Sequence, residues 1–355
     1  MENTSLAFFR SLLGTPAPSG FETAAAQLWR TEAATFADRV TADVAGNSFA
    51  TLDGTPGAPT IMFAGHIDEI GLMVVHIDEN GFLWFDTIGG WDEQVLVAQR
   101  VVLQGRDGPV RGVIGKKAIH LMDKEDREKV SKIKDLWIDI GATSREAAAK
   151  VIRVGDAGVL DTSILELPNG RIVSRSIDNR IGAFVVLEAL RRLKNKPAAA
   201  AVTAVATAQE EIAYTGGGAR TSAAGLAPTV ALVVDVTHAT DTPGIEKTRH
   251  GEVKLGGGPV VSRGSIINPR VVDLLVEVAA AEKIPVTLQA APKHTSTDAD
   301  AIFTSFKGVA TGLVSVPNRY MHSPNEMVVL DDLDRAAALL AGFARRVSTD
   351  TSFIP

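Results

Sequence analysis

The most informative segment of the chain is Ala201-Val202-Thr203-Ala204-Val205-Ala206-Thr207-Ala208-Gln209-Glu210-Glu211. Its first part carries no charge and consists of small and β-branched residues, which is typical of a strand buried on both faces in a parallel α/β sheet. The strand is followed by two adjacent carboxylates, at the edge of the sheet where α/β proteins bind ligands. A Glu-Glu pair by itself more often marks a solvated loop, so the rest of the chain must support the functional interpretation.

Length and composition restrict the possible classes of protein. The chain has 355 residues, which predicts about two domains. A net charge of −6, without a Lys/Arg cluster, argues against a nucleic-acid surface. There is no cysteine, so any metal must be held by His, Asp and Glu. The N-terminus lacks a basic signal region, and no run approaches the roughly 18 apolar residues of a membrane span. A cytoplasmic protein without membrane contact is the expectation.

Strands alternating with helices are expected on both sides of the central segment. The predicted strands are 39–43, 48–52, 60–64, 172–174, 229–234, 285–290 and 309–316. The predicted helices are 5–13, one opened by a capping box of Ser19 and Glu22 and running to about Phe36, 181–193, one opened by Asn268-Pro269, and one capped by Asp331 or Asp332 and running to about Arg345. This alternation predicts an α/β domain built on a mostly parallel sheet.

In the middle of the chain the predicted strands are separated mainly by turns and not by helices. Runs 72–77 and 82–88 flank Asp78-Glu79-Asn80-Gly81, and runs 101–104 and 110–114 flank a second Gly-containing turn, so two hairpins are predicted. A charged segment at 123–134, a strand at 136–140 and a short helix opened by Thr143-Ser144-Arg145-Glu146 follow. We therefore predict an inserted β-rich domain at 73–161, within a discontinuous catalytic domain of 1–72 and 162–355.

Imidazoles and carboxylates come closely after five of the predicted strands. They are His66 and Asp68, Asp178, Glu210 and Glu211, Asp235, and His322. Two imidazoles with several carboxylates and no thiolate suit Zn²⁺, Co²⁺ or Mn²⁺ in a hydrolytic site. One zinc ion would normally use about three protein ligands. The larger set favours two metals, because three ligand carboxylates together with a bridging hydroxide would balance the charge of two divalent cations.

Each of these residues also has a structural interpretation. Asp178 could instead cap a helix beginning at Asn179. Asp235 could be a turn residue, and His66-Ile67-Asp68 could form a turn with an Asx hydrogen bond. His76, His120, His250 and His294 are expected to be ordinary hydrogen-bonded or surface histidines. The joint pattern at five strand ends favours the metal site, although spacing cannot show that the residues converge in space.

Short motifs in consistent order along the chain resemble the M42 family of metallo-aminopeptidases, which includes the tetrahedral aminopeptidases. They are Pro18-Ser19-Gly20-x-Glu22, Gly65-His66-x-Asp68-Glu69-x-Gly71, Ile88-Gly89-Gly90-Trp91, Asp139-Ile140-Gly141-Ala142, Asp178-Asn179-Arg180-x-Gly182, Gln209-Glu210-Glu211, Asp235-Val236-Thr237, Gly257-Gly258-Pro259, Thr297-Asp298-Ala299 and Arg319-x-Met321-His322-Ser323-Pro324-x-Glu326. Together they span nearly the whole chain, and as a set they are highly specific.

The resemblance implies a zinc-peptidase-like α/β/α sandwich with a small inserted β-barrel, and a site with two divalent metals. His66, Asp178 and Asp235 would hold one metal, and Asp178, Glu211 and His322 the other. Glu210 would be the general base for a water held between the metals, and Asp68 would fix the His66 tautomer. Neighbouring side chains of extended backbone point in opposite directions, so the two glutamates can have different roles only if the backbone turns there.

The resemblance further implies a peptide-specific aminopeptidase that assembles through its insertion, commonly as a hollow dodecamer built from dimers. Two departures concern the loops expected to face substrate. Residues 212–218 read IAYTGGG where the family usually has a Gly and an Arg-Gly pair, and Asp300 stands where it often has a small residue. The rival functions are a carboxypeptidase, a deacylase or a glycan hydrolase on the same site, and a non-catalytic assembly protein.

Overall fold

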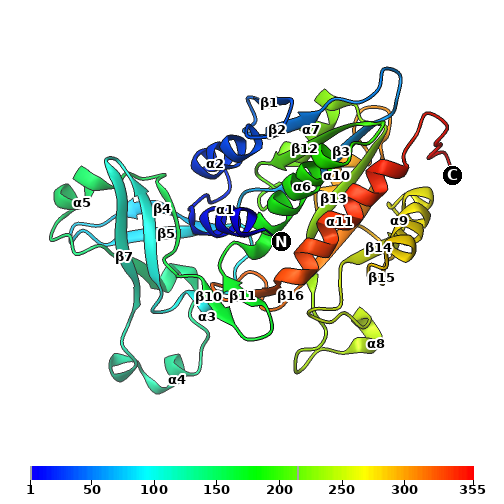
Figure 1. The fold of residues 1–355 in the computed structure, drawn as a ribbon. Helices are drawn as coiled ribbons and strands as arrows, with labels where there is room; N and C mark the ends of the chain where they lie inside the picture. Colours follow the sequence, from blue (N-terminus) through cyan, green and yellow to red (C-terminus); the bar gives the residue numbers. More distant parts are fainter. Residues whose placement is uncertain (1, 214–215) are drawn as a thin grey trace.

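The segment that ends in the two glutamates is a central strand, β12 (Ala201–Thr207), in the computed structural model, which describes residues 2–213 and 216–355 (Figure 1). It belongs to an eight-stranded sheet with the order β1-β2-β12-β3-β13-β16-β14-β15. The other strands are β1 (Arg39–Ala42), β2 (Ser48–Leu52), β3 (Thr60–His66), β13 (Val230–His238), β14 (Val260–Gly264), β15 (Thr287–Ala291) and β16 (Ala310–Asn318). The strands predicted for the α/β domain are thus confirmed in this sheet except 172–174, which lies in a separate three-stranded sheet, and β14 was not predicted.

The four central strands are parallel. β12 pairs with β3, β3 with β13, and β13 with β16, whereas β2 and β14 pair antiparallel with their inner neighbours. The carboxyl ends of β12, β3, β13 and β16 therefore meet at one edge of the sheet, as the alternation of elements predicts.

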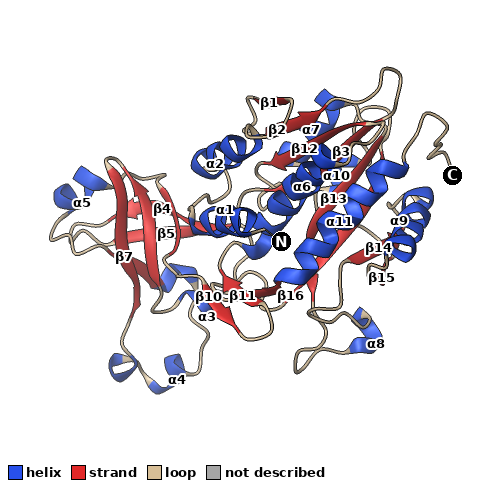
Figure 2. Ribbon diagram, viewed as in Figure 1, coloured by secondary structure: helices blue, strands red, loops and turns tan. Residues whose placement is uncertain are grey.

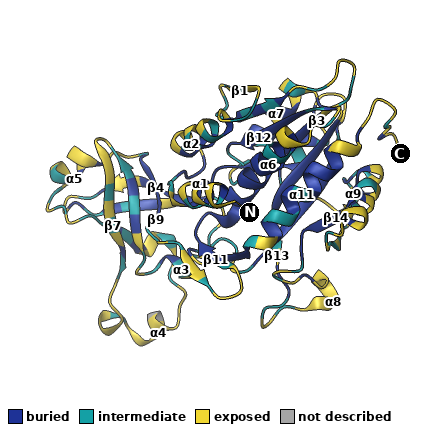
Figure 3. Ribbon diagram, viewed as in Figure 1, coloured by how far each residue is buried: buried dark blue, intermediate teal, exposed yellow. Residues whose placement is uncertain are grey.

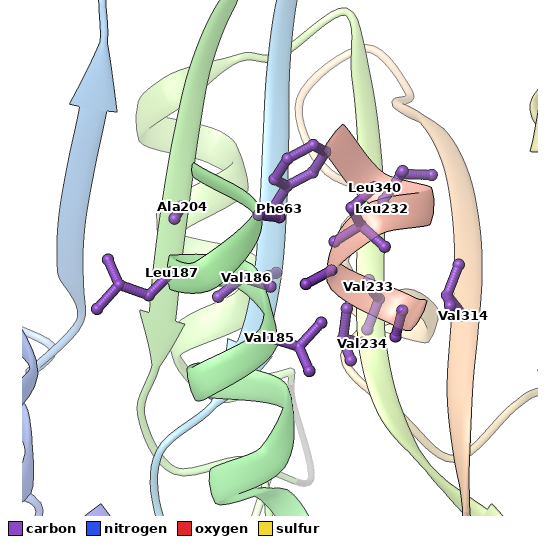
Figure 4. Packing of buried hydrophobic residues seen from close by; sticks show 14 of the residues in the cluster. Phe63, Val185, Val186, Leu187, Ala204, Leu232, Val233, Val234, Val314 and Leu340 are labelled. Carbon is purple, nitrogen blue, oxygen red and sulfur yellow. The ribbon is translucent and has the colours of Figure 1, made fainter. Parts of the chain in front are cut away.

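Helices cover the sheet in two layers. The helices α6 (Ile177–Asn195) and α11 (Leu330–Arg346) pack on one face together with α1 (Asn3–Gly14), α2 (Thr23–Ala33) and α9 (Pro269–Glu282), and the smaller α7 (Gly217–Leu226) and α10 (Ala299–Ile302) pack on the other (Figure 1). Val185 and Val186 of α6 belong to the same apolar core as Phe63 and Leu232 of the sheet (Figure 4). The central strands β12, β3, β13 and β16 and the inner sides of these helices are mostly buried, whereas the edge strands β1 and β15 are partly exposed (Figure 3). This is the predicted α/β/α sandwich.

A closed six-stranded barrel is inserted after β3, with the strand order β4-β5-β8-β7-β6-β9 (Figure 2). Its strands are β4 (Gly71–Ile77), β5 (Leu83–Ile88), β6 (Arg100–Gly105), β7 (Gly108–Lys116), β8 (Leu136–Asp139) and β9 (Ala157–Leu160). Both predicted hairpins are confirmed, as β4–β5 and β6–β7. The barrel has a separate apolar core that includes Leu72, Phe85 and Leu103. The domain boundaries at 72/73 and 161/162 remain a prediction.

Shorter elements complete the barrel region and its surroundings. The charged segment at 123–134 contains α4 (Lys124–Arg127), and α5 (Arg145–Val151) begins after Ser144, whose side chain accepts a hydrogen bond from the amide of Ala147. The remaining helices are α3 (Glu93–Leu96), α8 (Lys247–His250), η1 (Ile119–Leu121) and η2 (Ile133–Asp135). A three-stranded sheet of β10 (Leu165–Leu167), β11 (Arg171–Ser174) and β17 (Glu326–Val329) lies at the start of α6.

Two predicted helix caps are wrong. α2 begins at Thr23, and the Glu22 carboxylate accepts hydrogen bonds from the amides of Gly20 and Gln209. α11 begins at Leu330, and the Asp332 carboxylate accepts from the amides of Gly256 and Gly258. In both cases the acidic side chain binds backbone from a distant part of the chain, which a local capping pattern cannot reveal.

Within the described parts of the chain, no helix combines the length and the apolar character needed to cross a membrane.

Candidate metal centre

Histidines and carboxylates from four elements converge at the carboxyl edge of the parallel strands. His66 ends β3, Asp235 lies in β13, Asp178 lies in the first turn of α6, and His322 follows β16. Asp178 stands between the two imidazoles: its Oδ1 is 3.2 Å from His66 Nε2, and its Oδ2 is 3.5 Å from His322 Nε2. The two histidines are thus joined through one carboxylate.

The other three carboxylates surround this bridge. Asp235 Oδ1 is 4.0 Å from His66 Nε2, and Glu210 Oε2 is 3.7 Å from the same nitrogen. Glu211 Oε2 is 3.4 Å from His322 Nε2. Among the described residues, two triplets place one potential ligand atom from each member within 4.8 Å of the others: His66 with Glu210 and Asp235, and His66 with Asp178 and Glu211.

The backbone turns sharply before the two glutamates. β12 ends at Thr207, and Gln209 has a φ of 61°, in the left-handed region. The Asp68 carboxylate then accepts hydrogen bonds from the amides of both Glu210 and Glu211, each at 3.1 Å. Because the segment is no longer extended, both glutamate side chains can face the same cavity. The backbone turn that separate roles for Glu210 and Glu211 would require is therefore present.

Asp68 has a second contact, with the ligand candidate at the end of β3. Its Oδ1 lies 3.4 Å from His66 Nδ1, the ring nitrogen that faces away from the cluster. The alternative of a local Asx turn is wrong, because this carboxylate binds amides that lie 142 and 143 residues further along the chain. The alternative of Asp235 as a turn residue is also wrong, since Asp235 pairs with Ser315 inside β13.

Glu326 joins the two elements that carry Asp178 and His322. Its Oε2 accepts a hydrogen bond from the Asp178 amide at 2.9 Å, and its Oε1 accepts one from the His322 amide at 2.8 Å. The Glu326 side chain is buried. Glu326 is the first residue of β17, which pairs with β11, the strand that ends just before α6. Sequence reasoning included Glu326 in a motif but gave it no role. A glutamate four residues after the motif histidine was the only available signal.

Close backbone packing fixes the start of α6 against the sheet. Asn179 Nδ2 donates to the Val234 carbonyl at 2.8 Å, and Asn179 Oδ1 accepts from the Gly182 amide. A Cβ on Gly182 would lie 2.5 Å from the Val234 oxygen, and a Cβ on Gly65 would lie 2.4 Å from the Gly182 carbonyl carbon. Both glycines are therefore required for β3, β13 and α6 to approach. The Asp178–Asn179 peptide bond is cis.

The electrostatics of the cluster favour bound cations. Burial raises the pKa of Glu210 to about 10; the His66 ring opposes this rise, and the Asp235 and Asp298 carboxylates add to it. Burial also raises the pKa values of Asp235 and Glu211. Burial disfavours a charged His322 ring, but the Asp178 and Glu211 carboxylates outweigh it and raise its pKa to about 11. Burial therefore disfavours the ionised forms of these carboxyl groups, and a bound cation would favour them.

The residues present fit divalent metal ions. Glu211 Oε1 is buried without a hydrogen-bond partner, and neither Lys nor Arg is among the described residues that line the cavity. Buried carboxylates are normally paired with cations or coordinate metals. The donor set of imidazole nitrogens and carboxylate oxygens, without sulfur, is suited to zinc, cobalt or manganese.

The cluster opens into two adjoining cavities. The one at the cluster has a volume of about 290 Å³ and is also lined by Thr237, His238, Met321 and the segment Thr295–Thr297. The second cavity has a volume of about 630 Å³. Its lining includes residues from both departures from the family pattern: Ile212, Ala213 and Gly216 from the segment 212–218, and Asp300. Tyr214 and Thr215 lie outside the described residues. Glu210, Glu211, Ser296 and Thr297 line both cavities.

Comparisons with known proteins agree on one family. The family model of M42 glutamyl aminopeptidases matches residues 46–339. The lysyl aminopeptidase of Pyrococcus furiosus is 35% identical over 308 residues, which cover 85% of this chain and 86% of the relative.

Solved structures with the same fold include tetrahedral peptidases. The crystal structure of the TET aminopeptidase from the marine-sediment archaeon Thaumarchaeota archaeon SCGC AB-539-E09 superposes with a TM-score of 0.92 at 34% identity, covering 97% of each chain. The TET1 peptidase of Pyrococcus horikoshii, described as assembling into a tetrahedron or a large octahedral shell, superposes with a TM-score of 0.85 at 29% identity, covering 96% of this chain and 99% of its own.

Proposed function

The chain belongs to the M42 glutamyl aminopeptidase family, and we propose that it removes N-terminal residues from peptides with two divalent metal ions bound at the cluster. The observation that carries the proposal is the position of Asp178 between His66 and His322, with a further carboxylate beside each imidazole. Such a set offers two neighbouring metal positions that share one carboxylate.

The ligand assignment is the one that the family resemblance implies, because the distances alone would also allow Glu210, which lies 3.7 Å from His66 Nε2. His66, Asp178 and Asp235 would hold one ion, and Asp178, Glu211 and His322 the other. Zinc or cobalt suits these ligands best, and manganese is compatible with them. Two bound ions would polarise the scissile carbonyl and lower the pKa of a water molecule.

Glu210 is the proposed general base. Its carboxylate would take a proton from the attacking water on one of its Oε atoms and deliver that proton to the nitrogen of the leaving amine. Asp68 would support this step indirectly, because it binds the Glu210 and Glu211 amides and contacts His66 Nδ1. It thereby fixes the directions of the base, of one proposed ligand and of the His66 ring.

Substrate class can be tested with a panel of aminoacyl-anilides after reconstitution with Zn²⁺, Co²⁺ or Mn²⁺. We expect turnover of substrates with a free α-amino group and little turnover of their N-acetylated counterparts. Peptides blocked only at the carboxyl terminus should remain substrates. Preference for the N-acetylated compounds would instead indicate a deacylase, cleavage only at free carboxyl termini a carboxypeptidase, and turnover of glycans alone a glycan hydrolase. The absence of any metal-dependent turnover would favour a non-catalytic assembly protein.

We further propose that the protein is a homo-oligomer assembled through its barrel, with a dodecamer built from dimers as the expected form. The fold neighbour from Pyrococcus horikoshii forms a tetrahedron or a larger shell, and none of the proposed metal ligands lies in the barrel. A hollow particle of this kind would admit peptides and exclude folded proteins.

The assembly proposal predicts a change in mass when residues 73–161 are replaced by a short linker. β4 and β9 pair at Leu72 and Gly158, so the two ends of the replaced segment lie close together. The variant should have fewer subunits by light scattering than the full chain, and it should still bind metal by elemental analysis. An unchanged number of subunits would contradict the role of the barrel in assembly.

A further inference from the structure

The segment Thr295-Ser296-Thr297 forms the wall between the two cavities. All three residues line the cavity at the cluster, and Ser296 and Thr297 also line the larger one. Glu210 and Glu211 lie at the same junction. A volume of about 630 Å³ is within the usual range for a small-molecule site. A peptide whose scissile bond lies at the cluster would therefore contact this segment near its N-terminal residue.

The Asp300 carboxylate holds this wall in place. Its Oδ1 accepts hydrogen bonds from the Thr295 amide at 2.8 Å and the Thr295 hydroxyl at 2.7 Å, and its Oδ2 accepts from the Ser296 amide at 2.8 Å. Ser296 has a φ of 55°, a left-handed conformation that is uncommon for residues other than glycine. One side chain thus satisfies two successive amides of a tight turn.

A second carboxylate ties the following residues to the sheet. The buried Asp298 accepts a hydrogen bond from the Thr207 hydroxyl at 2.5 Å, at the end of β12. This contact positions the start of α10 relative to the strand that leads to Glu210. It does not fix the Thr295–Ser296 turn, for which Asp300 supplies the hydrogen bonds described above.

We infer that Asp300 is a positioning residue that holds Thr295–Thr297 as the wall against the substrate's N-terminal residue, and that it thereby sets which N-terminal side chains are accepted. The inference rests on the proposed aminopeptidase function. Asp300 does not touch the cluster itself in this arrangement; it acts through the backbone of the segment.

Two substitutions separate the contacts of Asp300. Asp300→Ala removes both acceptor oxygens and with them all three hydrogen bonds. Asp300→Asn keeps one oxygen, which can serve one of the two backbone amides, and its NH₂ group faces the other amide as a second donor. The asparagine variant should therefore have an intermediate effect. Asp78→Asn is a matched control, because Asp78 Oδ1 accepts from the amides of Asn80 and Phe82 in a turn of the barrel.

The experiment measures kcat and KM of the holoenzyme and its variants on aminoacyl-anilides with small, branched, acidic and basic side chains. For Asp300→Ala we expect KM and the order of preference to change, with kcat/KM falling up to about 10²-fold for the best substrates of the wild type. Asp300→Asn should change in the same direction by less, and Asp78→Asn should match the wild type. Metal content should be unchanged in all of them.

Hydrogen exchange gives a readout that does not need turnover. The amides of Thr295 and Ser296 should exchange faster in Asp300→Ala than in the wild type. In Asp78→Asn these two amides should exchange at the wild-type rate. If exchange at these amides is unchanged, or if Asp300→Ala keeps the wild-type order of preference and lowers kcat equally for every substrate, the inference is wrong. A wild type that turns over no aminoacyl-anilide would refute the proposed function instead, and exchange would still test the positioning.

Discussion

Glu210→Gln should lower kcat by about 10²–10⁴-fold while both metal ions remain bound, because an amide cannot accept the proton of the attacking water. The substitution is nearly isosteric, so the free energy of unfolding should change little. The loss should lie in kcat more than in KM, since the proposed base acts in the transition state. Added metal should not restore the rate.

Glu211→Gln is the matched comparison, with the same chemical change at the neighbouring residue. Here a neutral amide replaces a carboxylate oxygen 3.4 Å from His322 Nε2, so one metal should bind more weakly and excess metal should partly restore activity. The comparison is informative because Glu210, too, lies within ligand distance of His66 and Asp235. Metal content by elemental analysis, measured together with kcat, decides which glutamate is the ligand and which is the base. Loss of metal in Glu210→Gln with two ions retained in Glu211→Gln would reverse the assignment.

Removal of metal should abolish activity altogether. Without cations, the buried carboxylates of Asp235, Glu210 and Glu211 have raised pKa values, and the chain itself supplies no Lys or Arg to the cavity at the cluster among its described residues. Dialysis against a chelator should therefore remove turnover of aminoacyl-anilides, and Co²⁺ or Zn²⁺ should restore it.

Two controls accompany this measurement. Circular dichroism before and after chelation should show that the secondary structure is retained, so that loss of activity is not caused by unfolding. Asp78→Asn, far from the cluster, should lose and regain activity as the wild type does. Full activity in exhaustively demetallated protein would be incompatible with the proposed mechanism.

Most of the fold could be predicted because its signals are local. The uncharged runs at 60–64, 201–206 and 229–234 became buried parallel strands, and the Asn80-Gly81 turn became a hairpin. The ends of elements were less predictable. β13 continues through Asp235 to His238 because it pairs with β16 as far as Asn318, and such a partner is not visible in a single strand.

The candidate site was predictable only in part. The chemistry of His66, Asp178 and His322 is evident from residue type and motif, and the structure brings them together with the other proposed ligands. The contacts of Glu326 with Asp178, and of Asp68 with Glu210, join residues 148 and 142 positions apart. No local pattern encodes contacts of this range. The contacts of Asp300 are local, with residues four and five positions earlier, but the residue types alone do not indicate them.

The order of the elements along the chain has a consequence for synthesis on the ribosome. Every barrel strand pairs with another strand from residues 71–160, whereas β3 needs β12 and β13, and the cluster needs His322 near the end of the chain. Domains generally fold as units as they emerge. The barrel can therefore form early, but a nascent chain lacks the complete set of proposed metal ligands until His322 has been made. A growing or truncated chain thus lacks the set of groups that we propose for peptide hydrolysis.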